Sequence, residues 1–184
     1  MLKLGCPHAG VELFYGEGTY RSRTSQDNPD EAARVAERVL YHYDTRPDLS
    51  LGVVTFTQAQ AAAIETAVAT ARRQRPDLDR SFTTDRLGGF FVKTAASVQA
   101  DERDVLILST GYGPDENGQA TTDFRPLTGP GGWRTLNVAS PAPATAPEIL
   151  TSIRPSDTPD SVTSEALMHL RRYLTHAAQG VPGS

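Results

Sequence analysis

The sequence predicts an α/β domain in three layers, a parallel sheet with helices on both faces. Two observations carry this prediction. Apolar runs rich in β-branched residues alternate with segments of helical periodicity, a pattern typical of parallel sheets with helical crossovers. Two of the runs, 51–56 (LGVVTF) and 104–110 (DVLILST), are continuous, as in strands buried on both faces. The 184 residues are enough for one domain with its own core.

Five strands are expected along the chain. The first is a short apolar run, two flank a charged loop, and the last follows a proline-rich stretch. Their ranges are 11–15, 51–56, 90–94, 104–110 and 148–153.

Three helices are expected between and after these strands. The first begins at Asn28, which can cap it, has Pro29 in its first turn, and ends at Arg46 and Pro47. Its apolar positions recur at helical spacing: Ala33, Val35, Ala36, Val39, Leu40 and Tyr43. The second helix, 57–75, is alanine-rich and is closed by Pro76. The third, 164–179, carries leucines on one face.

The domain organisation follows from these elements. Residues 1–10 are expected to form a disordered or extended start, 11–179 a single domain and 180–184 a flexible tail. Residues 111–131 are rich in glycine and are expected to form a long loop, of the kind that often carries function.

Composition excludes several classes of protein. A formal net charge of −4 argues against a strong standalone nucleic-acid binder. No run of about 18 apolar residues is present, so no membrane span is expected, and the polar start predicts a cytoplasmic protein. Cys6 is the only cysteine, which excludes an internal disulfide. The four histidines are too scattered for a metal site, and none is expected: His8, His42, His169 and His176.

In parallel sheets, ligands bind beyond the carboxyl ends of the strands. The segments to search are therefore those after Phe56, around 94–103 and after Ile153. The loop from Gln99 to Asp104 could place carboxylates toward a ribose or a cation. Composition alone favours a solvated turn with acids that cap the next element.

Three blocks of sequence carry a resemblance to a known family. They are GVVTFTQAQAAAIE (52–65), VKTAASVQADERDVLILSTGYGPDENG (92–118) and GGWRTLNVA (131–139). In this order and spacing they resemble the fourth, fifth and sixth motifs of superfamily 1 nucleic-acid helicases, in the C-terminal, second RecA-like domain. The resemblance is greatest to large bacterial multidomain helicase-like proteins that have a trailing endonuclease-like domain. It implies a RecA-like (P-loop NTPase-like) fold and helicase activity in the longer protein.

The resemblance also implies roles for particular residues. Gln99, Glu102 and Asp104 would lie at the nucleotide. Single-stranded nucleic acid would be contacted by Thr55, Gln60 and Ser97, to which we add Lys93, a phosphate candidate beside the fifth motif. ATP and Mg²⁺ would be bound only together with the first RecA-like domain of the same longer protein. That domain and the single strand are the expected partners.

The chain departs from the family pattern in the sixth motif. The family continues with I-T-R-A-R-x-R, and its first arginine stabilises transition-state charge. Here residues 140–147 read SPAPATAP, so Pro141 and Ala142 replace the arginine-finger region and no catalytic set is complete. Deleting one base from a GC-rich coding of the family peptide yields these eight residues, which suggests a compensated frameshift. A milder departure is Ala100, where the family has glycine.

Two functions remain open from the sequence. No G-x-x-x-x-G-K-[ST] segment is present, so the phosphate-binding first domain is expected to be missing and the isolated chain to be inactive. The chain is then either one half of an ATP-dependent motor or a catalytically dead module that binds nucleic acid or protein. A small independent hydrolase is disfavoured, because no Ser-His-Asp or Cys-His arrangement is evident.

Overall fold

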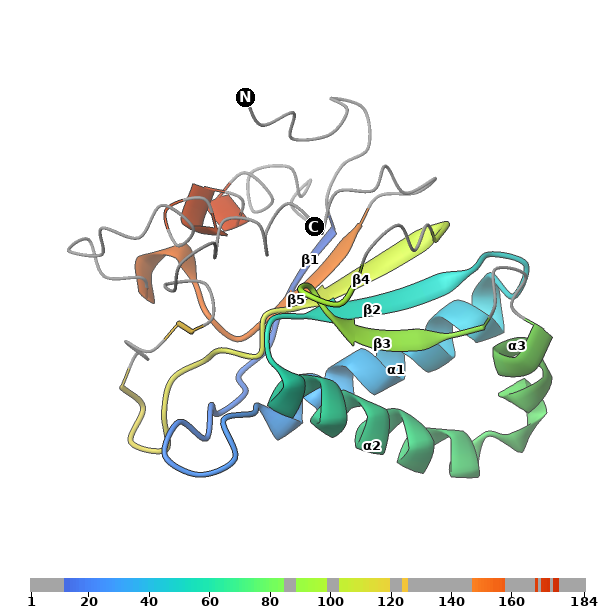
Figure 1. Ribbon diagram of the computed structural model, residues 1–184, viewed down its shortest axis with the longest axis horizontal. Coiled ribbons are helices and arrows are strands. Elements are labelled where there is room, and N and C mark those ends of the chain that lie inside the picture. The colour runs from blue at the N-terminus through green and yellow to red at the C-terminus, as the bar shows by residue number, and fades with distance from the viewer. Residues whose placement is uncertain are drawn as a thin grey trace.

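Five parallel strands form one sheet in the computed structural model (Figure 1). The order across the sheet is β1-β5-β4-β2-β3. The strands are β1 (Glu12–Tyr15), β2 (Leu51–Thr55), β3 (Phe91–Thr94), β4 (Val105–Ser109) and β5 (Glu148–Thr151). The structure describes residues 12–84, 89–98, 103–119, 124–125, 147–157, 168, 170–172 and 174–175.

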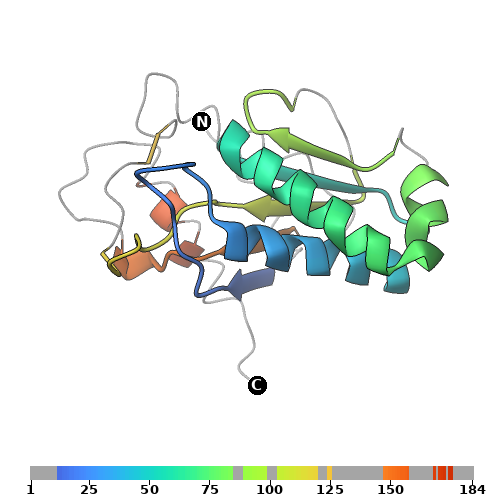
Figure 2. The same cartoon turned by 90° about the horizontal axis from the view of Figure 1, so that it is seen from below.

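Two long helices, α1 (Pro29–Thr45) and α2 (Gln58–Gln74), lie side by side on one face of the sheet (Figure 2). The Asn28 side chain accepts the Glu31 N–H, so the predicted cap of α1 is confirmed. Thr57 caps α2 in the same way, by accepting the Gln60 N–H. Shorter elements follow α2 and β5: the 3₁₀ turn η1 (Pro76–Leu78), helix α3 (Asp79–Thr84) and the 3₁₀ turn η2 (Pro155–Asp157).

The core lies on both faces of the sheet, because successive strand residues point to opposite sides. Val53 packs with the residues of α1 and α2, whereas Val54 packs on the other face with Leu170 and Leu174. Leu170 and Leu174 lie in a helical segment. Helices therefore cover both faces, and the predicted three-layer α/β fold is confirmed, consistent with a RecA-like domain.

The strands match their predicted ranges to within one or two residues at each end. The short helix α3 was not predicted, because DRSFTT has neither an apolar period nor the length that marks a helix. The expected third helix is described only at 168, 170–172 and 174–175. Residues 1–10 and 180–184 lie outside the described residues. Within the described part, no helix is long and apolar enough to cross a membrane.

Candidate functional site

A buried carboxylate, that of Glu31, lies at the carboxyl ends of β4 and β5. Its Oε1 accepts the Ser109 hydroxyl and the Gly111 N–H, both at 2.7 Å. Its Oε2 accepts the Ser152 hydroxyl at 3.0 Å. Helix α1 thus begins directly against the ends of two central strands, and one side chain joins the three segments.

Asn28 and Gln60 continue this network toward α2. In a capping box, a glutamate at the third helical position accepts the N–H of the capping residue. Here Gln60 Oε1 accepts the Asn28 N–H at 2.8 Å instead, which leaves Glu31 for the strand ends. Gln60 Nε2 donates to the Ser109 hydroxyl at 3.2 Å, and Asn28 Nδ2 donates to Ser152 Oγ at 3.0 Å. The starts of α1 and α2 and the ends of β4 and β5 therefore form one hydrogen-bonded unit.

Burial controls the ionisation of Glu31. The residue is 1% exposed, and desolvation raises its pKa from 4.5 to about 7. Hydrogen bonds from Ser109, Gly111 and Ser152 act in the opposite direction, because they stabilise the ionised form. Within the described ranges, the carboxylate is thus bonded to neutral donors and to no cation.

This pKa makes stability depend on pH. Between pH 4.5 and about 7, the folded chain binds the Glu31 proton more tightly than the unfolded chain does. The free energy of unfolding is therefore expected to fall as pH rises through this window, by on the order of 3 kcal/mol, and to level off above it. Urea unfolding at pH 5 and pH 8 measures the difference. The variant Glu31→Gln cannot titrate, so its free energy of unfolding should change much less.

The comparison of the wild type with Glu31→Gln isolates Glu31, because the other described carboxyl groups with shifted pKa values titrate at lower pH. The pKa values of Asp77 and Asp115 are lowered by hydrogen bonds, so these groups change stability only at more acidic pH. Equal pH dependence in the wild type and in Glu31→Gln would show that Glu31 does not have the raised pKa.

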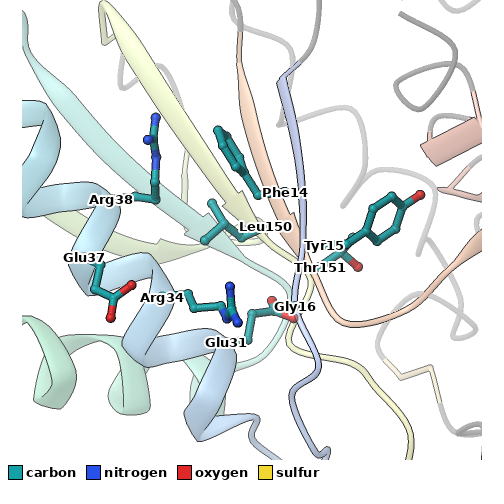
Figure 3. A pocket seen from close by; sticks show the side chains of 9 residues that line it. All are labelled: Phe14, Tyr15, Gly16, Glu31, Arg34, Glu37, Arg38, Leu150 and Thr151. Carbon is teal, nitrogen blue, oxygen red and sulfur yellow. The ribbon is translucent and has the colours of Figure 1, made fainter. Parts of the chain in front are cut away.

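A small pocket opens beside Glu31, between β1 and α1 (Figure 3). Its volume is about 80 Å³, and its lining includes Tyr15, Gly16, Arg34 and Thr151. Small-molecule sites commonly enclose roughly 300–1,000 Å³. This pocket alone is therefore far too small for a nucleotide. Among the described residues, no group of three or more His, Cys, Asp or Glu side chains could hold a metal ion.

The residues predicted to contact nucleic acid lie toward the carboxyl ends of β2 and β3. Thr55 ends β2, is buried, and its hydroxyl has no hydrogen-bond partner among the described residues. Gln60 is fully buried, with its amide engaged as described above. Ser97 is exposed and donates to the Thr94 carbonyl at 2.9 Å. Lys93 is half-buried, with Nζ 5.0 Å from the centre of the Phe91 ring.

Asp104, predicted to lie near the nucleotide, is at the opposite end of the sheet. Its Oδ2 accepts the N–H and the hydroxyl of Ser50, at 2.9 and 2.8 Å, where β2 and β4 begin. A five-residue strand separates it from the carboxyl ends by roughly 15 Å. The structure therefore does not bring Asp104 together with Thr55 and Gln60. Gln99, Glu102, Pro141 and Ala142 lie outside the described residues.

Sequence reasoning did not identify Glu31 as the centre of the network. By its place in the sequence, the acid indicates only a helix start. A usable signal was present in the paired hydroxyl residues that end two strands, Ser109 with Thr110 and Thr151 with Ser152. Hydroxyl groups at buried strand ends need partners, and a nearby acid can supply one.

Comparison with known proteins gives two partial similarities. A stretch of 135 residues, 71% of the chain, is 33% identical to an uncharacterized ATP-dependent helicase of Mycoplasma pneumoniae. A stretch of 118 residues is 36% identical to the corresponding protein of Mycoplasma genitalium. The chain spans only 12% and 10% of the lengths of these relatives. No protein-family model matches the chain. The similarities relate it to a small part of ATP-dependent helicases.

Proposed function

We propose that this chain is the second RecA-like motor domain of an ATP-dependent superfamily 1 helicase. It would close on a nucleotide-loaded first domain of the same longer protein, over single-stranded nucleic acid. Alone it would not hydrolyse ATP, because it has neither a Walker A segment nor an arginine in the region that replaces the sixth motif.

The observation that carries the proposal is the direct connection between the two helicase-like blocks. The first block ends β2 and begins α2, which contains Gln60. The second block contains β4, which pairs with β2 in register, Thr55 beside Ser109. The Gln60–Ser109 hydrogen bond then links them at the carboxyl end of the sheet. Two segments that resemble motor motifs thus form one region of the molecule, as a motor domain requires.

ATP and Mg²⁺ would be held between this chain and the first domain. The 80 Å³ pocket cannot enclose a nucleotide, and none of the proposed nucleotide contacts is among the described residues that line it, so the shared site is proposed from the family resemblance alone. Gln99 and Glu102 are the proposed nucleotide contacts. Asp104 would act by fixing the start of β4 through Ser50 rather than by touching the nucleotide.

Single-stranded nucleic acid would lie near the ends of β2 and β3. Ser97 and Lys93 supply a hydroxyl and a cation for phosphate contacts, the usual backbone contacts of such proteins. Thr55 is fully buried, so it would act by shaping the end of β2 rather than by touching the strand. Gln60 would hold the neighbouring segments in place rather than contact the strand, because its amide already bonds to Asn28 and Ser109.

The proposal predicts weak, salt-dependent binding to a labelled oligo-dT or oligo-U strand, measured by fluorescence anisotropy. Lys93→Gln is expected to weaken binding about 3–10-fold at low salt, because one cation near the strand is removed. The slope of log K against log salt should also decrease, by about 0.7 for each phosphate that the protein no longer neutralises. ATP turnover in the same samples is expected to be absent.

Arg73→Gln is the matched control. Arg73 is exposed near the end of α2, and its substitution removes the same charge at a distance from the proposed strand path. Equal effects of the two variants would show that only net charge matters. Steady ATP hydrolysis that is lost on Glu102→Gln would contradict the inactivity of the isolated chain.

A catalytically dead interaction module is the second candidate. It is favoured by one observation, that no lysine or arginine occurs between Arg134 and Arg154. Failure to bind a single strand at low salt would support the form of this module that binds protein. In the gene, an arginine-rich peptide in the neighbouring frame at codons 140–147 would favour the motor instead.

A further inference from the structure

The crevice at the carboxyl ends of β1 and β5 is a position where α/β sheets commonly bind ligands. Such crevices arise where neighbouring strands continue to opposite faces of the sheet. β1 leads to α1 on one face, whereas β5 leads to Ile153 in the core of the other face. In this chain the Glu31 carboxylate is bonded to the ends of β4 and β5, and Glu31 lines the pocket beside the end of β1.

The groups around that carboxylate donate hydrogen bonds to its ionised form, and they offset part of the desolvation that raises its pKa. The donors bonded to it are the backbone N–H of Gly111 and the hydroxyls of Ser109 and Ser152. Thr110 Oγ1 lies at 3.5 Å from Oε2. Converging N–H and hydroxyl groups of this kind bind carboxylates and phosphates. An amide in place of the carboxylate would lose the charge that strengthens these bonds.

The carboxylate is enclosed by backbone on one side and reached by the pocket on the other. A Cβ atom added to Gly18 would lie 2.8 Å from Ser152 Oγ, and one added to Gly113 would lie 2.6 Å from the Gly18 carbonyl oxygen. These two segments therefore cover the site without room for a solute. The pocket of Figure 3 leads to Glu31 between Arg34 and Thr151, and Arg34 is exposed.

We propose that the strand ends form a carboxylate-binding cradle, occupied by Glu31 of the chain itself, which binds a free small carboxylate once that side chain is removed. Glu31 is then a positioning residue. It holds the segments after β4 and β5 against α1, and it excludes other anions from the crevice. The inference does not depend on the proposed motor function.

The test uses the full chain at pH 8 in sodium chloride, with sodium acetate or formate exchanged for chloride at constant ionic strength. Glu31→Ala is expected to unfold at a lower temperature than the wild type. Acetate should raise the midpoint temperature of unfolding of Glu31→Ala by about 2–5 °C when its concentration is well above the dissociation constant of the acetate complex. The increase should level off as the site saturates. Acetamide, uncharged and of the same shape, should have no such effect.

Two variants serve as controls. Glu37→Ala removes an exposed carboxylate that lines the same pocket, so acetate should not stabilise it more than the wild type. In Glu31→Gln an amide occupies the cradle, so acetate should not raise the midpoint temperature of unfolding. If Glu31→Ala does not fold in buffer, its refolded fraction is measured by circular dichroism in acetate, formate and acetamide. Recovery in the anions alone supports the cradle. The proposal is overturned by equal responses to acetate and acetamide, or by no response to either anion.

Discussion

Replacing both arginines that bind Glu148 is expected to lower the free energy of unfolding by about 3–5 kcal/mol, as when a buried charge loses its partners. Arg38 donates to Oε2 of Glu148 through two nitrogens, at 3.0 and 2.8 Å, and Arg46 donates to Oε1 at 2.9 Å. The glutamate side chain is only 3% exposed. In Arg38→Met with Arg46→Met, the carboxylate would stay buried without these two cations. Urea unfolding at pH 8 measures the loss.

A third substitution tests the cause. Adding Glu148→Leu to the double variant removes the buried charge and should restore most of the stability, because apolar replacement of a buried ion network is often neutral. Arg73→Met, an exposed change on α2, should stay within about 0.5 kcal/mol of the wild type. A double variant that loses less than about 1 kcal/mol would show that Glu148 does not need these partners.

Gly18→Ala is expected to cost about 3–5 kcal/mol, from overpacking together with the loss of a helix cap and of a buried hydrogen bond. The added Cβ would lie 2.2 Å from Asn28 Oδ1. That side chain cannot move freely, because it accepts the Glu31 N–H and donates to Ser152 Oγ. Urea unfolding at pH 8, with circular dichroism as the signal, measures the change.

Gly118→Ala is the matched control, because there an added Cβ meets no atom but the backbone is strained. Gly118 has φ +74°, and nothing lies within 4 Å of an added Cβ. Its cost comes only from the left-handed backbone and should be about 1–2 kcal/mol. If Gly18→Ala costs no more than Gly118→Ala, then the close approach of Gly18 to Asn28 is not tightly constrained.

These predictions describe one helix held at both ends. At its start, Glu31 and Asn28 join α1 to the ends of β4 and β5. Toward its end, Arg38 and Arg46 join it to Glu148, the first residue of β5. Movement of α1 relative to the central strands would break bonds at both ends. In a motor that closes on a partner domain, this part would therefore move as a rigid body.

The fold could be predicted because its signals are local. The continuous apolar runs marked β2 and β4, and the capping Asn28 with Pro29 marked the start of α1 within one residue. Each signal needs only neighbouring residues, because strand burial and helix capping act over a few positions. Strand order was not predicted, and β5 lies between β1 and β4 although it comes last in the chain.

The candidate site was predicted less completely, for a physical reason. The charged loop before β4 drew attention to Asp104, yet parallel strands place a residue before β4 at the end opposite Thr55 and Gln60. Gln60, predicted to contact nucleic acid, lies at the carboxyl end of the sheet, and that role stays a prediction. Its partners were not predictable, because Asn28 lies 32 positions away and Ser109 lies 49 away.

By itself, the sequence determined the fold class, the strands, the capped start of α1 and the resemblance to helicase motifs. These depend on periodicity, local hydrogen bonding and residue order, all of which a linear chain records. Only the tertiary structure decided that Glu31 bonds to the ends of β4 and β5, since its partner Ser152 is 121 positions away. It also decided that Asp104 lies at the opposite end of the sheet from Thr55 and Gln60. Both outcomes depend on which strand ends meet, and that is fixed only when the sheet assembles.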